Sequence, residues 1–290
     1  MAILKVENLC KTYPTFKLKN VSFSLEEGKI MGFIGRNGAG KTTTLKAIMN
    51  LIHLEEGKIE IFGQPFDDNE LHNKTRIAFA LGGADYFPFK TVEQLTKVTA
   101  RFYPDWDQNK FEHYLDVFEL DKKKKIKELS SGMKVKYSLA VALSHNAELF
   151  ILDEPTSGLD PISRDEILYI FQQLVKDGKR SVLFSTHITS DLDKCADTIT
   201  YIRDGELVVS NKTKEDFIES YRLISGETSL FNGEIQKSMI SSREEKDKTV
   251  GLIESKYMAS IPKGIEVDIP DLESVMVFME WGNSNEKFIV

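Results

Sequence analysis

The chain has 290 residues, which is enough for one sizeable hydrophobic core and a small second domain. Its content of 41% hydrophobic and 29% charged residues is typical of a soluble globular protein, and its net charge of −7 argues against a nucleic-acid-coating role. One basic cluster, at residues 122–125 and Lys127, is interpreted as a solvated helix end or loop in preference to a ligand site.

The cysteine content and the hydropathy pattern indicate the redox compartment of the chain and its relation to the membrane. Cys10 and Cys195 lie far apart and outside any metal-ligand spacing, which favours a reducing cytosol without a disulfide framework or a zinc site. Residues 1–7 alternate like a strand and not like a signal peptide. Apolar runs such as residues 274–279 are shorter than the ~20 residues that span a bilayer. We therefore expect that the chain itself does not cross a membrane.

Two strands are predicted at residues 3–6 and 18–25, with polar turns between them. Tyr13 lies between these strands, ahead of a glycine-rich loop. An aromatic ring in this position can fold back over a nucleotide and stack on its base. The alternative is that Tyr13, next to Pro14, only packs locally. The loop that follows favours the stacking role.

A phosphate-binding loop follows an apolar, strand-like run at residues 29–34 and precedes a helix-like run at residues 44–49. Its pattern is G-x-x-x-x-G-K-T, in which backbone N–H groups can approach phosphate oxygens at the positive end of a helix dipole. Lys41 would reach the β- and γ-phosphates, the Thr42 hydroxyl would ligate Mg²⁺, and Thr43 would contact the α-phosphate. A glycine-rich turn with a solvated lysine is the weaker alternative. The predicted nucleotide-binding residues here are Gly35, Asn37, Gly38, Ala39, Gly40, Lys41, Thr42 and Thr43.

A helical insertion is predicted after two further strands at residues 57–63 and 76–81. Apolar residues recur at helical spacing from Thr91 to about Leu120, with a break at residues 102–107. A second helical pattern then begins after residues 129–133, of sequence LSSGM, which on their own would be an ordinary helix cap.

Two carboxylates are predicted at the carboxyl end of a buried parallel strand, residues 149–153. Asp153 suits an outer-shell contact to Mg²⁺, and Glu154 suits a base that orients and polarises the attacking water. A plain exit from the strand into a turn is the alternative. A second buried run, residues 181–186, ends at His187, which beside a γ-phosphate can hydrogen-bond the phosphate and the water but is structural in many other settings. An Asp-Gly hairpin at residues 199–208 closes the domain near residue 212.

Residues 1–212 together resemble the ATP-binding subunit of ABC transporters, with the motifs in the family's order. Tyr13 matches the adenine-stacking aromatic, residues 35–42 the Walker A loop, residues 129–133 the signature loop, residues 149–154 the Walker B strand, residues 157–160 the D-loop and His187 the switch histidine. The resemblance implies an α/β fold, a P-loop RecA-like ABC nucleotide-binding domain with a helical subdomain at about residues 87–145.

The resemblance also implies a head-to-tail dimer with two ATP molecules and Mg²⁺ at its interface. Ser130 and Gly132 of one subunit would contact the γ-phosphate held by Lys41 of the other, and Ser131 and Asp160 would lie at the same interface. Ser131 and Met133 depart from the usual LSGGQ signature. Serine is nearly as small as glycine, so we expect the phosphate contact to survive.

Another departure is at the Q-loop, where Gly82 stands in place of the expected glutamine. Glycine has no side chain with which to ligate Mg²⁺ or orient water, and Asp85 or a water molecule would have to substitute. Residues 86–89, of sequence YFPF, lie where the family contacts its membrane partner. They would either form a groove for a short helix of that partner or pack within the helical insertion.

Residues 213–290 lie outside the motifs and predict a small α+β C-terminal appendage, with a helix start at residues 213–216, a polar run at residues 241–249 and an apolar ending. The appendage, the missing glutamine and the FYPDWD segment resemble ATPases that serve ABC-2-type permeases. That branch includes exporters of antibiotics, of lipids and of peptides, among them amphipathic cytolytic peptides such as phenol-soluble modulins.

The sequence thus predicts an ATP-hydrolysing subunit, at the cytoplasmic face of the cell membrane, that powers a separate integral membrane permease. Its dimer would be a homodimer or a heterodimer with another ABC ATPase, and we expect no nucleic-acid partner. The alternative function is a soluble ABC ATPase acting on ribosomes or nucleic acid. Against it, the chain has a single set of motifs and no long heptad insertion between residues 41 and 153.

Overall fold

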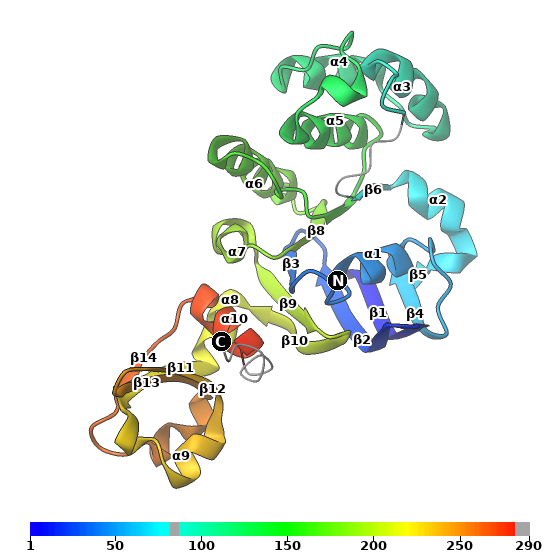
Figure 1. The fold of residues 1–290 in the computed structure, drawn as a ribbon. Coiled ribbons are helices and arrows are strands. Elements are labelled where there is room, and N and C mark those ends of the chain that lie inside the picture. The colour runs from blue at the N-terminus through cyan, green and yellow to red at the C-terminus, as the bar shows by residue number, and fades with distance from the viewer. Residues whose placement is uncertain (82–86, 282–290) are drawn as a thin grey trace. The chain divides into compact units, whose positions relative to one another are not determined.

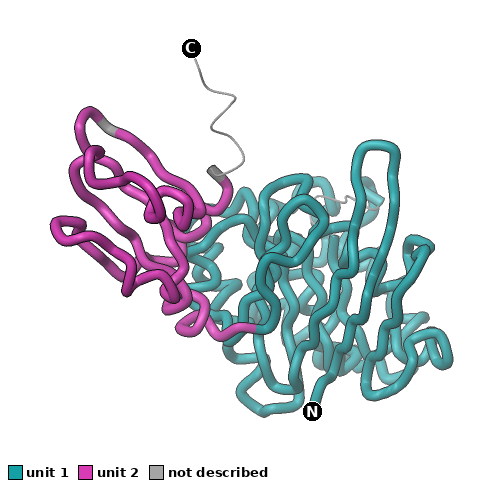
Figure 2. Tube along the Cα trace, turned by 90° about the horizontal axis from the view of Figure 1, so that it is seen from below, with its two compact units in different colours: residues 1–211 teal, residues 212–290 magenta. Residues whose placement is uncertain are grey.

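The computed structural model describes residues 1–81 and 87–281 of the chain. These residues divide into two compact units on either side of the Asn211–Lys212 bond (Figures 1 and 2). The first unit contains two sheets and most of the helices, and the second contains a sheet of its own.

The central sheet of the first unit has the strand order β10-β9-β3-β8-β7-β6. The pairs β3–β8, β3–β9, β6–β7 and β7–β8 are parallel. Strands β3, β7 and β8 are buried at every residue, as expected of apolar runs in a sheet covered on both faces. The strands are β3 (Ile30–Ile34), β6 (Ile77–Leu81), β7 (Leu149–Asp153), β8 (Ser181–Thr186), β9 (Thr198–Arg203) and β10 (Glu206–Thr213).

The predicted hairpin between β9 and β10 is confirmed. Asp204 and Gly205 have φ values of 49° and 79°, the signs required of a tight two-residue turn. A side chain at Gly205 would place its Cβ 1.8 Å from the Lys17 carbonyl oxygen, so only glycine fits there.

The second sheet of this unit is antiparallel, with the order β2-β1-β4-β5. Its strands are β1 (Ala2–Tyr13), β2 (Phe16–Glu26), β4 (Glu56–Ile61) and β5 (Gln64–Pro65). A single cluster of buried apolar side chains joins this sheet, helix α1 (Lys41–Ile48) and the central sheet, and it includes Leu4, Leu45 and Leu183.

The predicted ends of the first two strands are wrong, because β1 continues through residues 10–13 to Tyr13 and β2 begins at Phe16. Register irregularities between Val6 and Lys11 break the regular alternation of apolar side chains that marks a strand in the sequence. Tyr13 therefore lies at the end of a strand, paired with Phe16 across the hairpin, and not within a long turn.

Three longer helices make up the helical insertion: α3 (Val92–Thr99), α4 (Gln108–Val117) and α5 (Ser131–Ser144). Thr91 caps α3 by accepting a hydrogen bond from Gln94 N, and Asp107 caps α4 by accepting from Lys110 N. The predicted break near Pro104 is confirmed. The remaining helices of the unit are α2 (Glu70–Thr75), α6 (Pro161–Val175) and α7 (Thr189–Cys195) and short turns at Phe66–Asn69, Ala100–Phe102 and Ile126–Glu128.

His145, at the end of α5, is buried against the segment that joins α3 and α4. Its ring stacks on Tyr103 with centroids 3.7 Å apart, and its Nδ1–H donates to the Thr75 carbonyl oxygen at 2.9 Å. Burial lowers the pKa of His145 from 6.5 to about 4.

This burial makes the stability of the first unit depend on pH. The unfolded chain takes up the proton near pH 6.5 but the folded chain only near pH 4, so the stabilisation is present above pH 6.5 and is lost as the pH falls. We expect it to account for about 2 kcal/mol of lost unfolding free energy between pH 7 and pH 5. Denaturant titrations should show a correspondingly smaller loss in His145→Phe, and an unchanged loss in a variant of the exposed His113, His113→Gln. Equal losses in all three proteins would contradict the assignment.

The second unit has an antiparallel sheet in the order β12-β13-β11-β14. The polar run at residues 241–249 belongs to a hairpin of two strands, β12 and β13, whose turn lies within the consecutive charged residues 243–248. A small core holds Ile224, Phe231, Ile235 and Ile253. The elements are α8 (Lys214–Glu219), β11 (Tyr221–Glu227), α9 (Gly233–Ser238), β12 (Met239–Glu245), β13 (Lys248–Glu254), β14 (Glu266–Asp268) and α10 (Leu272–Trp281), with short turns at Thr228–Leu230 and Ser255–Ser260.

Candidate functional site

The carboxyl ends of β3, β7 and β8 place three motif segments side by side, since parallel neighbours end at the same edge of a sheet. The glycine-rich loop follows β3, Asp153 ends β7, and His187 follows β8. Gly38 and Gly40 have φ values of 86° and 114°, which are accessible mainly to glycine. The loop therefore opens directly onto the amino terminus of α1, where N–H groups have no side-chain cap.

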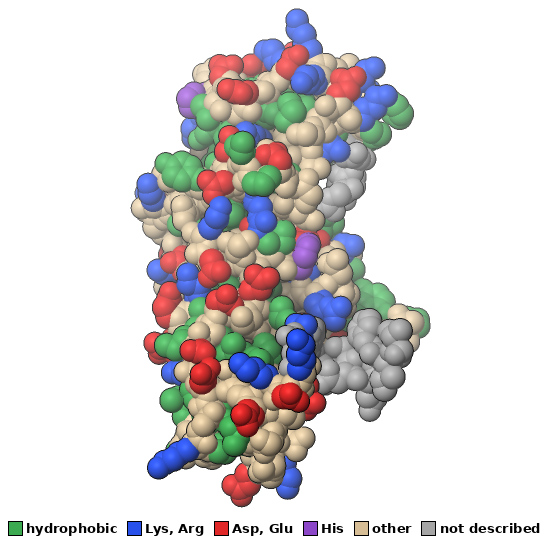
Figure 3. All heavy atoms as spheres, turned by 60° about the vertical axis from the view of Figure 1, so that its left-hand side comes forward, with side chains coloured by type: hydrophobic (Ala, Val, Ile, Leu, Met, Phe, Trp, Pro, Cys, Tyr) green, Lys and Arg blue, Asp and Glu red, His purple; other side chains and the backbone are tan. Residues whose placement is uncertain are grey.

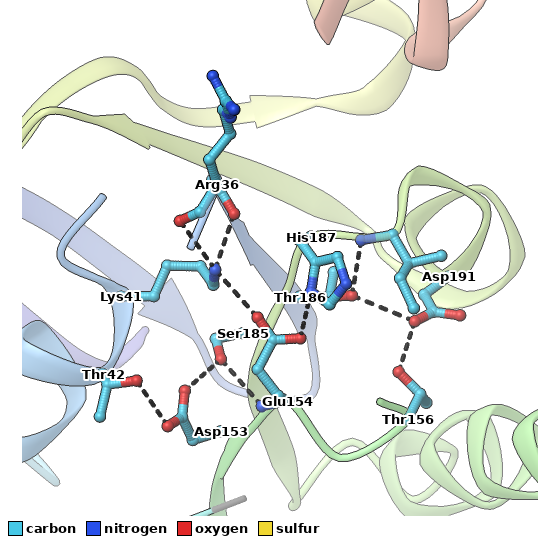
Figure 4. Close-up of polar contacts among 12 residues, drawn as sticks. Arg36, Lys41, Thr42, Asp153, Glu154, Thr156, Ser185, Thr186, His187 and Asp191 are labelled. Carbon is cyan, nitrogen blue, oxygen red and sulfur yellow. Dashed lines mark hydrogen bonds and ion pairs between the residues drawn. The ribbon is translucent and has the colours of Figure 1, made fainter. Parts of the chain in front are cut away.

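Lys41 is almost completely buried, with 5% of its side chain exposed. Its Nζ donates to the carbonyl oxygens of Gly35 and Arg36, at 2.7 and 3.2 Å, and lies 2.9 Å from Glu154 Oε1 (Figure 4). Oε1 makes no hydrogen bond of regular geometry, so the contact with Lys41 is an ion pair and not a directed hydrogen bond. Lys41 of the glycine-rich loop and Glu154, the residue that follows β7, thus form an ion pair.

Glu154 also contacts the histidine at the end of the neighbouring strand. Its Oε2 accepts a hydrogen bond from His187 Nδ1 at 2.8 Å. Glu154 has a φ of 50°, a left-handed conformation that costs a residue with a side chain about 1 kcal/mol. Its N–H donates to Ser185 Oγ at 3.0 Å, which helps to hold this conformation. A strained, partly buried carboxylate between a lysine and a histidine is the arrangement expected of a functional group.

Asp153 is held by two hydroxyl groups. Thr42 Oγ1 donates to Asp153 Oδ2 at 2.7 Å, and Ser185 Oγ donates to Asp153 Oδ1 at 2.6 Å (Figure 4). The hydroxyl and carboxylate oxygens of Thr42 and Asp153 are the hard donors that Mg²⁺ prefers, and they face each other beside the glycine-rich loop. The donor set therefore fits the predicted magnesium ion.

A pocket of about 610 Å³ lies in front of the glycine-rich loop. This volume is within the range of sites for small ligands. Of the residues predicted from the sequence, the pocket lining includes Tyr13, Asn37, Gly38, Gly40, Lys41, Thr42, Thr43 and Glu154. The structure thus brings the predicted aromatic, the loop and the predicted base around one cavity, although Tyr13 and Glu154 are far apart in the sequence.

Four residues in this lining were not named as candidate site residues in the sequence analysis. Two are the aromatic Phe16 and the charged Arg36, and two are the turn residues Pro14 and Thr15. Phe16 was detectable in principle, because it is an aromatic residue three positions after Tyr13 in the sequence. In the structure the two residues pair across the hairpin.

The signature residues lie elsewhere in the first unit. Ser130 and Ser131 are exposed at the start of α5, and Ser130 Oγ accepts a hydrogen bond from Met133 N at 3.2 Å. Gly132 is buried against α6, where an added Cβ would lie 3.4 Å from Ser163 Cβ. Asp160 caps α6, and the Ser163 hydroxyl and N–H hold the pKa of its carboxyl below the usual value. None of these predicted residues is among the described residues that line the pocket.

Gly82, Asp85 and Tyr86 lie outside the described residues, so what replaces the Q-loop glutamine stays a prediction. Phe87 and Phe89 are described, and 64% and 72% of them are exposed. Neither ring is buried within the helical insertion, although Lys127 Nζ lies 5.0 Å from the centre of the Phe89 ring. Which of the two predicted arrangements holds stays a prediction.

Comparison with known proteins identifies the family. A profile of the family described as ABC transporter matches residues 18–157. The bacitracin transport ATP-binding protein BcrA of Bacillus licheniformis is 34% identical over 209 residues, which cover 71% of this chain and 68% of that protein. The chain belongs to the ATP-binding subunits of ABC transporters.

Two further similarities extend this assignment. The ABC transporter ATP-binding protein YcbN of Bacillus subtilis is 29% identical over 296 aligned positions, which cover 94% of this chain and 92% of that protein. A solved structure of an ATP-binding subunit of an ABC transporter superimposes with a TM-score of 0.66 at 27% identity, and covers 74% of this chain and 91% of that one. The predicted fold, an ABC nucleotide-binding domain, is confirmed.

Members of this ABC family bind ATP, couple its hydrolysis to transport and assemble with transmembrane permease components. The alternative of a soluble ABC ATPase on ribosomes or nucleic acid is not favoured, because these relatives are described as transporter subunits. Within residues 1–81 and 87–281, no helix has the length and hydropathy required to span a bilayer.

Proposed function

We propose that this subunit hydrolyses ATP in the pocket in front of the glycine-rich loop, with Glu154 as the base, to drive export by a separate integral membrane permease. The observation that carries the proposal is the position of the Glu154 carboxylate, 2.9 Å from Lys41 Nζ and 2.8 Å from His187 Nδ1. A base must lie beside both the group that binds the γ-phosphate and the group that contacts the attacking water.

Entry of the γ-phosphate changes the partner of Lys41. The phosphate carries more negative charge than a carboxylate, so Lys41 Nζ transfers its ion pair from Glu154 to the phosphate. Glu154 is then left with His187 and accepts a proton from the water that attacks phosphorus. The Glu154 carboxylate is thus paired with Lys41 until ATP binds, and the binding of ATP releases it to act as the base.

The Thr42 hydroxyl would ligate Mg²⁺, and the Asp153 carboxylate would contact the ion in its outer shell. A magnesium ion supplies positive charge that neutralises the phosphate oxygens. Gly35, Asn37, Gly38, Ala39, Gly40 and Thr43 would contact phosphates, largely through backbone N–H groups.

Tyr13 is proposed to stack on adenine, since it lines the pocket and 36% of it is exposed. Tyr13→Ala is expected to weaken ATP binding by about 1 kcal/mol, or roughly five- to tenfold, because a stacking face is lost. Tyr13→Phe keeps the ring and should bind normally. Equilibrium titrations would check this, with inorganic tripolyphosphate, which lacks a base, as the control ligand. An equal loss of tripolyphosphate affinity in Tyr13→Ala would contradict stacking.

The active form is proposed to be a head-to-tail dimer, either of two copies or with another ABC ATPase. Ser130 and Ser131 are exposed, and the N–H groups at the start of α5 lack anionic partners within the described residues. Ser130, Ser131, Gly132 and Asp160 would complete the ATP site of the opposite subunit, which explains why they lie outside the pocket of their own chain.

Phe87 and Phe89 are proposed to contact the permease. Two exposed phenylalanines within three residues suit the apolar face of a short helix. The subunit would thus be held peripherally at the cytoplasmic face of the membrane. Because BcrA is described as a bacitracin transport protein, we propose an exported cargo of peptide antibiotic, amphipathic peptide or lipid-like character.

Fractionation of cells tests this contact. A double variant, Phe87→Ser with Phe89→Ser, is expected to move most of the chain from the membrane to the soluble fraction while its ATP affinity stays within twofold. Phe102→Ser, which removes another aromatic that is 72% exposed in the helical insertion, is the control and should stay with membranes. Full membrane retention of the double variant would contradict the proposed contact.

The face of the molecule drawn in Figure 3 has charges of both signs. On the face drawn in Figure 3, acidic and basic side chains alternate over most of the surface. Nucleic-acid binding generally requires a coherent basic stripe, which this face does not show, and the net charge is −7, so we expect no nucleic-acid partner.

A further inference from the structure

Asp191, in the first turn of α7, is a completely buried carboxylate outside the nucleotide pocket. Its Oδ2 accepts hydrogen bonds from the hydroxyl groups of Thr156 and Thr186, at 2.6 and 3.2 Å (Figure 4). Its Oδ1 pairs with Arg164 Nε at 2.5 Å. A buried charge is costly unless it is paired and hydrogen-bonded, and here both oxygens have partners.

Each partner of Asp191 belongs to a segment that carries a residue of the proposed ATP site. Thr156 lies two residues after Glu154, at the start of the turn that leads to Asp160. Thr186 immediately precedes His187. Arg164 lies in the first turn of α6, the helix that Asp160 caps.

Thr186 extends the network in two directions. Its Oγ1 accepts a hydrogen bond from Ile188 N at 3.0 Å, which closes the turn that contains His187. Its carbonyl oxygen accepts a hydrogen bond from Gly35 N, at 3.4 Å, at the start of the glycine-rich loop. The Thr186 hydroxyl therefore stabilises the turn that contains His187, and the Asp191 carboxylate holds the Thr186 hydroxyl in position.

We propose that Asp191 is a positioning residue for ATP hydrolysis, whose buried carboxylate holds the turn that carries His187 against the turn that follows Glu154. Asp191 does not touch the pocket itself. It acts by setting the distance between Glu154 and His187, two side chains carried on different strands. The inference rests on the proposed role of Glu154.

The geometry separates this role from a general contribution to helix packing. A second carboxylate, Asp165, joins the same two helices by an ion pair with Lys194 at 2.5 Å. Asp165 is 65% exposed, and neither partner contacts a segment that ends at Glu154 or His187 within the described residues. Loss of Asp165 thus reports on the link between α6 and α7 alone.

The test compares Thr156→Val, Thr156→Ser, Asp191→Asn and Asp165→Asn in the full chain, with kcat, KM and ATP affinity measured for each. Misplacing a catalytic group by a fraction of an ångström has a large effect on rate. We expect Thr156→Val and Asp191→Asn to lower kcat by roughly ten- to a hundredfold, with KM and ATP affinity within twofold. Thr156→Ser, which keeps the hydroxyl, should recover most of the rate, and Asp165→Asn should match the unaltered chain.

Three results would overturn the inference. One is an unchanged kcat in Thr156→Val, whose shape is preserved and which should fold even if Asp191→Asn does not. Another is an equal loss of kcat in Asp165→Asn, and the last is a parallel loss of ATP affinity in Thr156→Val. Glu154→Gln measured alongside keeps the two proposals apart: full turnover in that variant refutes the base, whereas an inactive Glu154→Gln with a fully active Thr156→Val refutes only the positioning role.

Discussion

Glu154→Gln is expected to lower ATP turnover by at least a hundredfold while ATP binding is retained or strengthened. General-base catalysis contributes about 10²–10⁴ in rate, and a glutamine amide cannot accept the proton. The substitution also removes the negative charge that holds Lys41 and faces the incoming phosphate, so binding should not suffer. Steady-state hydrolysis and equilibrium ATP binding, measured on the same preparation, separate the two effects.

The matched control for this variant is Glu148→Gln. Glu148 precedes β7, the strand that Glu154 follows, and accepts hydrogen bonds from Arg76 Nε and Nη2 at 2.6 and 2.8 Å, away from the pocket. Its loss should leave turnover within twofold. A Glu154→Gln chain that keeps more than a tenth of the original rate would rule out Glu154 as the base. The same variant should also accumulate an ATP-stabilised dimer, which gel filtration with ATP and Mg²⁺ would detect.

Lys41→Ala is expected to weaken ATP binding by about 10- to 100-fold. Hydrogen bonds to charged groups contribute roughly 1.5–3 kcal/mol each, and Lys41 would make at least one to the phosphates. The substitution also leaves the half-buried Glu154 without its cation, so thermal stability should fall in the absence of nucleotide. Titration with ATP and a thermal melt of the same protein measure both effects.

Lys46→Ala is the control for Lys41→Ala. Lys46 lies in the last turn of the same helix, α1, and does not line the pocket among the described residues. The Lys46→Ala substitution removes one positive charge from the same helix as Lys41→Ala does, but it should leave the ATP affinity within twofold. Unchanged affinity in Lys41→Ala would argue against a phosphate-binding loop, and an equal loss in Lys46→Ala would indicate a nonspecific effect of charge.

The local part of the ATP site was predictable from the sequence. Glycines before Lys41 and an apolar run that ends at Asp153 are short, continuous patterns whose physical causes act within a few residues. The structure adds how the segments meet: Thr42 reaches Asp153, and Glu154 lies between Lys41 and His187.

Contacts between distant segments were not predictable. Asp191 is an ordinary charged residue in the sequence, and only the fold shows that it is buried with Thr156 and Arg164. The full length of β1 was missed because irregular register disrupts the alternation on which strand prediction depends. The hairpin at residues 241–249 was missed because the consecutive charged residues 243–248 show none of the alternation that marks a strand in the sequence.

The structure explains in part how the signature loop tolerates Ser131 and Met133 in place of the usual glycine and glutamine. The Ser130 hydroxyl caps α5 by accepting from the backbone N–H of Met133, so this cap does not depend on the side chain at position 133. Gly132 is buried beside Ser163, where an added Cβ would be in ordinary van der Waals contact, whereas Ser131 is exposed and has room for its side chain. A serine in place of the usual glycine at position 131 is therefore compatible with the fold.

The most direct test of the central claim is recovery of the partner. Tagged Glu154→Gln chain, purified with ATP and Mg²⁺ from detergent-solubilised membranes, should bring with it a multi-span protein that lacks an ATPase domain, identified by mass spectrometry. That result is expected if this subunit powers a separate permease. Recovery of ribosomal or DNA-bound proteins, without a membrane protein, would contradict it.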